Sequence, residues 1–155
     1  MISTLTVVSS ASALASAAAG GMMFVFSTFV MGGLDRAGPQ DAIAAMRGIN
    51  AAAQTSATFL LAYFGAALLA IAMGVMAAVV SSPGRGWLLA GAVLGVAGAV
   101  VTVAANVPLN DGLDAAVATP EVWQAYLANW TSWNHVRTLT SLVAAALTMI
   151  GVVRQ

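Results

Sequence analysis

The sequence has very few charged residues, no lysine and no cysteine. Asp, Glu, Lys and Arg make up only 6% of its 155 residues, whereas soluble domains carry roughly 25%. Five arginines balance five acids, so the formal net charge is zero, and the basic surface of a nucleic-acid-binding protein is excluded. The absence of cysteine excludes disulfides, thiolate metal sites and a cysteine nucleophile.

Long uncharged runs take up most of the chain, and 61% of the residues are hydrophobic. No charged residue occurs in the runs 1–34, 48–84, 86–110 and 138–153. A helix needs about 20 apolar residues to cross a bilayer, and the first three runs exceed that length. We therefore predict an all-α protein: a four-transmembrane-helix bundle forming one domain over residues 1–155, with short amphipathic helices at one end.

The expected membrane spans are Leu5–Gly32, Ala51–Val80, Trp87–Ala105 and a C-terminal helix ending near Val153. No Lys or Arg precedes the first span, and its apolar run is longer than the hydrophobic region of a signal peptide. We therefore expect this segment to be retained as a membrane helix.

A short amphipathic helix is predicted before the second span. Pro39 suits the first turn of a helix, and Asp41 suits its positive end. Arg47 and Asn50 are three residues apart, so they lie on one face. No helix-breaking residue follows, so we expect this helix to run directly into the second span.

Two prolines mark the expected boundaries in the second half of the chain. Pro108 lacks a backbone N–H group, so the third span is expected to end at Asn106. Thr119 and Pro120 are residue types preferred at the N-cap and at the first helical position. They predict a helix whose aromatic side chains lie at the membrane interface.

The most polar cluster of the sequence is Trp130–Arg137, which leads directly into the last apolar run. That run, Thr138–Val153, is 16 residues long and covers about 24 Å, less than the hydrocarbon thickness of about 30 Å. Either the span therefore starts upstream and takes Asn134, His135 and Arg137 into the membrane edge, or the bundle shields a polar site there. Both alternatives place the cluster at or just inside one membrane surface.

Four spans place both termini and the turn 81–86 on one side of the membrane. The arginines divide almost evenly between the two sides, and the acids all lie on the other side. We expect both termini to be cytoplasmic in a bacterial cytoplasmic membrane. Arg47, Asn50, Asn106 and Asn110 then lie at the same end of the bundle as Trp130–Arg137.

The residue types gathered at that end suit proton abstraction from a planar phenolic substrate. His135 can act as a general base, while arginine and asparagine side chains can stabilise an oxyanion in a dry site. Spacings of three and four place Trp130, Trp133, Asn134, Arg137 and Ser141 on one helix face. Tryptophan rings can stack on a flat ligand, and Phe24 belongs to a bulky stretch that can form an apolar wall.

Other interpretations remain open at the level of the sequence. His135 can be a structural hydrogen-bond partner, Arg137 can extend to the lipid headgroups, and the tryptophans can form an interfacial belt. His135 can also be the axial ligand of a haem in a haem- or quinone-binding redox protein. A non-catalytic membrane protein, such as a transporter or a complex subunit, is the third alternative. Small-residue faces also allow a homo-oligomer.

Four motifs, in this order, resemble the anthrone oxygenase-like family of small four-helix membrane proteins. They are Phe24-Val-Phe-Ser-Thr-Phe-Val-Met31, Ala44-Ala-Met-Arg-Gly-Ile-Asn50, Asn106-Val-Pro-Leu-Asn110 and Trp130-Thr-Ser-Trp-Asn-His-Val-Arg137. The resemblance implies oxidation of an anthrone to an anthraquinone by O₂ without an added cofactor. It further implies that His135 deprotonates the substrate and that Arg137, Asn134 and Asn106 stabilise the anion. Trp130 and Trp133 would flank the rings, with Asn50, Arg47, Asn110 and Phe24 around them.

Overall fold

The computed structural model describes residues 3–155, so the first two residues of the predicted domain lie outside it. Its described residues form helices and no strand, which confirms the predicted all-α class. The elements in chain order are α1 (Thr4–Val25), the π-helical segment η1 (Phe26–Val30), α2 (Met31–Arg36), α3 (Pro39–Thr55), α4 (Ala57–Val79), α5 (Arg85–Val101), the π-helical segment η2 (Thr102–Asn106), α6 (Val107–Ala115) and α7 (Pro120–Val153).

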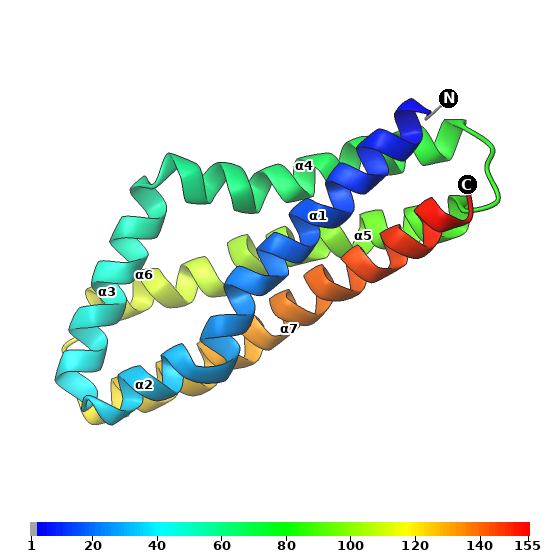
Figure 1. Ribbon diagram of the computed structural model, residues 1–155. Helices are drawn as coiled ribbons and strands as arrows, with labels where there is room; N and C mark the ends of the chain where they lie inside the picture. Colours follow the sequence, from blue (N-terminus) through cyan, green and yellow to red (C-terminus); the bar gives the residue numbers. More distant parts are fainter. Residues whose placement is uncertain (1–2) are drawn as a thin grey trace.

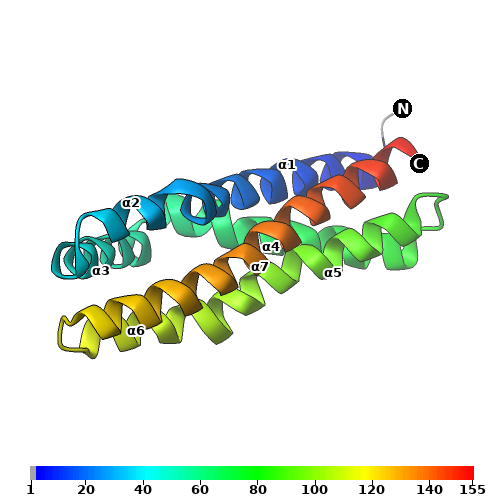
Figure 2. The same ribbon diagram turned by 90° about the horizontal axis from the view of Figure 1, so that it is seen from below.

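Four continuous helical stretches are long and apolar enough to cross a membrane, and the chain is an integral membrane protein. They are Thr4–Arg36, Ala57–Val79, Arg85–Ala115 and Pro120–Val153. In the bundle, α7 packs against α1 and α5, and α4 packs against the same two helices (Figures 1 and 2). The four-helix bundle expected from the uncharged runs is therefore confirmed.

The two ends of the bundle differ. Both termini and the turn between α4 and α5 lie together at one end, as the sequence predicted (Figure 1). The opposite end contains α2, α3 and α6, which agrees with the expectation of short amphipathic helices at one end. There the Trp123 indole N–H donates to Asp35 Oδ1 at 2.8 Å and ties α7 to α2.

Glycine allows α5 and α7 to approach closely. A Cβ atom on Gly91 would overlap Thr148 Oγ1 and would lie 3.2 Å from Ala144 O. Small residues permit such contacts between membrane helices. The pairing of α5 with α7 therefore depends on the missing side chain at Gly91.

The structure corrects the prediction that the amphipathic helix continues unbroken into the second span. α3 ends at Thr55, and Ser56 adopts an extended conformation with ψ of 101°. The Ser56 side chain then accepts a hydrogen bond from Phe59 N and so caps α4. α3 and α4 consequently meet at a corner, which Figure 1 shows at the end away from the termini.

The structure also corrects the prediction that the third span ends at Asn106. The helix continues through Pro108 to Ala115 because the backbone changes to π-helical pairing over η2. There Val107 N–H donates to Thr102 O, five residues back. Pro108 then occupies the first turn of α6, where its missing N–H is tolerated.

The structure contains the features of both alternatives for the C-terminal span: α7 begins upstream of the cluster, and the bundle buries the polar side chains of Asn134 and Arg137. α7 is one helix of 34 residues, capped by the Thr119 side chain with Pro120 in the first turn. Its length is about 51 Å at 1.5 Å per residue, whereas the hydrocarbon core is about 30 Å thick. If the apolar C-terminal part spans the core, the segment Trp130–Arg137 lies at the membrane boundary.

Candidate functional site

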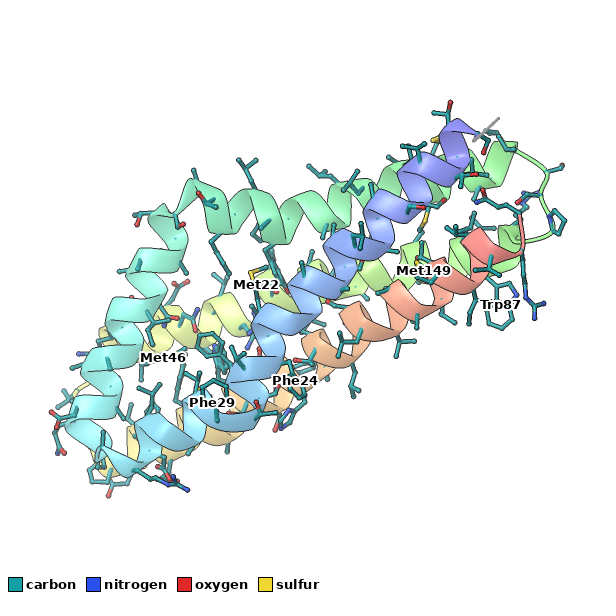
Figure 3. The ribbon with its side chains drawn as sticks, in the orientation of Figure 1. Met22, Phe24, Phe29, Met46, Trp87 and Met149 are labelled. Atoms are coloured by element: carbon teal, nitrogen blue, oxygen red, sulfur yellow. The ribbon has the colours of Figure 1, made fainter. Side chains whose placement is uncertain are left out.

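A cavity of about 400 Å³ lies within the end of the bundle that contains α3 and α6. The walls come from α3 and α4 on both sides of Ser56, from Met23 and Phe26 at the α1–η1 junction, from η2 and α6, and from α7. Met46 projects from α3 toward the interior of the bundle and is buried (Figure 3). The α3–α4 corner thus holds α3 across the end of the bundle and forms one side of the cavity.

Aromatic rings form two parts of the cavity wall. Phe26 and Trp130 lie with their ring centroids 5.6 Å apart, and Phe59 and Tyr63 stack at 5.9 Å. Such walls favour a flat apolar ligand because ring faces and edges can pack against it.

Arg137 brings a positive charge into this apolar cavity. The side chain is 5% exposed, and its guanidinium carbon lies 5.0 Å from the centroid of the Trp130 ring. Its Nη2 atom donates to Asn134 Oδ1 at 2.7 Å, and Nη1 donates to Thr102 Oγ1 at 3.4 Å. Both partners are neutral, so a ligand with a negatively charged oxygen would complement the guanidinium.

Asn134 holds Arg137 in place from the side of α1. Its Nδ2 group donates to Met23 O and to Ser27 Oγ, both at 2.8 Å. These two bonds fix the orientation of the amide, so Oδ1 faces the Arg137 guanidinium. Asn134 is fully buried, so it links the α1–η1 junction to the charged group of the cavity.

Two further asparagines connect η2 and α6 to α7. Asn106 Nδ2 donates to Trp130 O at 3.2 Å. Asn110 Oδ1 accepts from the Trp130 indole N–H and from the Tyr126 hydroxyl, both at 2.9 Å. These bonds fix the position and the ring plane of Trp130 at the cavity wall.

Three buried polar atoms of the cavity-lining residues have no hydrogen-bond partner within the described part of the chain. They are Asn50 Nδ2, Asn106 Oδ1 and Arg137 Nε. A buried polar atom without a partner costs about 1–3 kcal/mol. Such atoms are common where a ligand or ordered water completes the hydrogen bonding.

Tyr63 and Thr102 also line the cavity, although neither was predicted from the sequence as a site residue. The Tyr63 hydroxyl lies 2.7 Å from Thr102 Oγ1 and donates to Gly98 O at 3.2 Å. Thr102 Oγ1 in turn accepts the bond from Arg137 Nη1. Tyr63 could have been noticed because it is a tyrosine inside the apolar run 57–79. A buried phenol usually finds a polar partner, so its presence indicates other polar groups nearby.

Both π-helical segments lie beside the cavity. η1 begins three residues after Met23, which lines the cavity and whose carbonyl accepts a hydrogen bond from Asn134. η2 contains the cavity residues Thr102 and Asn106. π-helical turns occur frequently at functional sites because they change the direction in which side chains project. Sequence periodicity assumes a regular α-helix, so it could not predict either segment.

Three of the predicted residues do not line the cavity. His135 is exposed and is absent from the cavity wall, because it lies 100° around α7 from the buried Asn134. Trp133 turns outward from the same helix and is 45% exposed. Phe24 is 50% exposed on α1, where its neighbour Met23 faces the cavity instead.

Arg47 was expected beside the substrate, but it lies elsewhere. Its guanidinium donates to Leu113 O at 2.8 Å and to Ala116 O at 2.7 Å. These carbonyls belong to the end of α6, so Arg47 joins α3 to α6 and does not line the cavity. The predicted residues that do line the cavity are Asn50, Asn106, Asn110, Trp130 and Arg137.

The cavity residues do not fit the haem alternative. That alternative depended on His135 as axial ligand, and this residue, the only histidine of the sequence, lies outside the cavity. Within residues 3–155, no group of three or more His, Cys, Asp or Glu side chains is arranged to hold a metal ion.

The fold and the cavity define a small four-helix integral membrane protein with an aromatic-walled cavity and a buried arginine. The model of the anthrone oxygenase family matches residues 57–147, which is more than half of the chain. The chain therefore belongs to the anthrone oxygenase family. The match includes Tyr63, Thr102, Asn106, Trp130 and Arg137, whereas α1 and α3 lie outside it. Comparison with curated proteins and with solved structures gave no match.

Proposed function

We propose that the protein is a membrane oxygenase whose cavity binds a planar, mostly apolar aromatic compound with an acidic oxygen. Family membership supports an oxygenase-like function, and the cavity supports the class of substrate. The observation that carries the proposal is the buried Arg137 guanidinium, which stacks on Trp130 and has neutral hydrogen-bond partners. An anthrone or a related phenol has both the flat rings and the acidic oxygen.

The proposed recognition has two parts. Phe26 and Trp130 pack against the rings, while Arg137 binds the oxygen that becomes an enolate or phenolate. Burial strengthens this electrostatic contact because little water competes for the guanidinium. The bound anion is thereby stabilised relative to the neutral ligand, which makes deprotonation easier.

The overall reaction would convert a CH₂ group and O₂ into a C=O group and water. The CH₂ carbon loses a proton to water, and Arg137 holds the enolate oxygen. The enolate passes one electron to O₂, and the two radicals combine into a C–O–O bond. After the peroxide takes up a proton, the same carbon loses its second hydrogen as a proton while the O–O bond breaks. The C–H electron pair forms the C=O bond, and the departing hydroxide and the proton leave as water. O₂ is the only oxidant required.

Because His135 lies outside the cavity, the proposal assigns it no role as base. The contribution of the protein is instead the stabilisation of the anion by Arg137 and the positioning of that side chain by Asn134 and Thr102. Oxyanion stabilisation of this kind is commonly worth about 10²–10³ in rate.

The test is aerobic turnover of emodin anthrone by the purified protein in lipid nanodiscs, with empty nanodiscs as the blank. Arg137→Gln removes the charge in the cavity, and Arg154→Gln is the matched control, since Arg154 stacks on Trp87 at the other end of the bundle. We expect quinone formation above the blank, a loss of about 100-fold in Arg137→Gln, and an unchanged rate in the control. Oxidation at the rate of the blank would contradict the oxygenase proposal, and ligand binding without turnover would indicate a binding protein.

A further inference from the structure

We propose that the corner between α3 and α4 is a gate, and that molecules reach the cavity when the helix turns on either side of Ser56 open. This inference rests on the proposed function only in taking the cavity as the place where a ligand binds. The gate is the segment 51–58, which joins the last turn of α3 to the first turn of α4 (Figure 1). Its cavity-lining residues are Ala52, Ala53, Gln54 and Ser56.

The gate is held weakly, although it forms one wall of the cavity. None of the side chains in the segment 51–58 is buried. The Thr55 hydroxyl donates only to carbonyls of its own helix, and Ser56 Oγ accepts from Phe59 N, three residues along the chain. Within residues 3–155, no side chain of the gate forms a hydrogen bond to α1, α5, α6 or α7. Segments with few buried contacts open locally at the lowest free energy.

The helices on both sides of the gate are held firmly. Before it, Met46 belongs to a buried hydrophobic cluster that includes side chains of α7, and Arg47 donates to two carbonyls at the end of α6. After it, the Tyr63 hydroxyl donates to Gly98 O and lies 2.7 Å from Thr102 Oγ1. The gate can therefore open while the rest of the bundle stays assembled.

Ser56 is the point at which the gate can yield. Its extended backbone, with φ of −81° and ψ of 101°, interrupts the helix. Helix ends leave backbone groups without partners in the helix, and the Ser56 side chain satisfies one of them by accepting from Phe59 N at 3.3 Å. Loss of this cap should therefore favour fraying of the first turn of α4.

The gate also lies at a suitable depth for an apolar ligand. α4 is one of the four membrane spans and begins at Ala57, so the preceding corner lies at a membrane boundary. Aromatic groups with a polar end favour this level of the bilayer, as the side chains of Trp and Tyr do. A gate at the boundary suits a ligand that arrives from the membrane.

The absence of cysteine allows the gate to be measured with one introduced thiol. Met46→Cys places this thiol in the cavity wall, at a position that is 1% exposed. Met73→Cys is the matched control, since Met73 is 0% exposed and does not line the cavity. The full-length variants in nanodiscs are treated with N-ethylmaleimide, and intact-protein mass spectrometry follows the reaction. We expect Met46→Cys to react at least about tenfold faster, because local opening requires less free energy than opening of the core.

The reaction rate should depend on the cap at Ser56. Ser56→Val, combined with Met46→Cys, suits an extended backbone but removes the acceptor, whereas Ser56→Asn keeps an acceptor. We expect Ser56→Val to raise the rate about fivefold, as for the loss of one N-cap, and Ser56→Asn to leave it within about twofold. Neither substitution should change the rate of Met73→Cys. Ile49→Cys, which also lies in the cavity wall on α3, is used if Met46→Cys cannot be purified.

Three results would overturn the gate. Equal rates for Met46→Cys and Met73→Cys would mean that the cavity stays closed. A Met46→Cys rate that does not respond to Ser56→Val would mean that molecules reach the cavity by another route. A parallel rise at both positions would show general unfolding in place of local opening. Because the reagent is not an aromatic ligand, the gate holds or fails independently of the oxygenase proposal, which the turnover of emodin anthrone tests.

Discussion

The Arg137 guanidinium lies over the ring of Trp130, with its central carbon 5.0 Å from the ring centroid. The indole N–H of the same ring donates to Asn110, and the backbone carbonyl of Trp130 accepts from Asn106. Trp130 therefore supports the charged group of the cavity and is itself held by two asparagines. A cation placed over an aromatic face gains about 0.5–2 kcal/mol, with the larger values for desolvated sites.

Trp130→Leu should weaken ligand binding by about tenfold or more, because it removes the ring that supports Arg137 and packs on the ligand. Trp133→Leu is the matched control on the same helix, since Trp133 is 45% exposed and faces outward. Titration of both variants with 2-hydroxyanthraquinone in nanodiscs measures the difference. Equal losses in the two variants would contradict a cavity wall formed by Trp130.

His135→Ala should leave the rate of anthrone oxidation within about twofold of the wild type, because the imidazole is exposed outside the cavity. The steady-state rate at saturating substrate and O₂ measures this. A rate reduced to that of empty nanodiscs, in a variant that remains folded, would restore His135 as the base.

Thr102→Val should weaken anthrone binding or turnover by roughly five- to tenfold, because about 1 kcal/mol is lost for each missing hydrogen bond. Valine keeps the size of the side chain, but it removes the hydroxyl that contacts both Tyr63 and Arg137. Thr140→Val is the control, since the Thr140 hydroxyl bonds only to carbonyls of its own helix. A larger loss in Thr140→Val than in Thr102→Val would show that the effect comes from destabilised helices.

The spans could be predicted from the sequence because membrane helices follow from the length and charge of apolar runs. The same reasoning gave wrong helix boundaries at Ser56 and Pro108, because the local backbone conformation determines whether a helix ends there. Serine is not a strong helix breaker, yet Ser56 ends α3 by capping α4. Pro108 normally ends a helix, but the π-helical pairing before it removes the conflict. Neither outcome follows from residue propensities.

The sequence predicted which end of the bundle holds the candidate site, but only some of the residues that form it. Asn106, Trp130, Asn134 and Arg137 could be grouped from helical spacing and from the order of the spans. Helical spacing also separates His135 from Asn134 by about 100° around α7. His135 was predicted as the base because of its chemistry, whereas its position in the structure follows the spacing. Hydrogen-bond partners on other helices could not be predicted, because they depend on how the helices pack. The Met23 carbonyl, which accepts from Asn134, is one example.

Gly91→Ala tests the contact that aligns α5 with α7 beside the cavity. A Cβ atom there would overlap the Thr148 hydroxyl, which can rotate, but it would also lie 3.2 Å from Ala144 O and 3.3 Å from Thr148 N. These two atoms belong to the backbone of α7, so the helices must separate slightly, and overpacking of this kind costs about 1–3 kcal/mol.

The control for Gly91→Ala is Gly21→Ala, where nothing lies within 4 Å of the added methyl group. Alanine is preferred to glycine in a helix by about 1 kcal/mol, so this control should be as stable as the wild type or more stable. Thermal unfolding in detergent, followed by circular dichroism, measures both variants. A lower midpoint in Gly91→Ala alone would establish the close contact, whereas equal midpoints would mean that α5 and α7 can accommodate a methyl group between them.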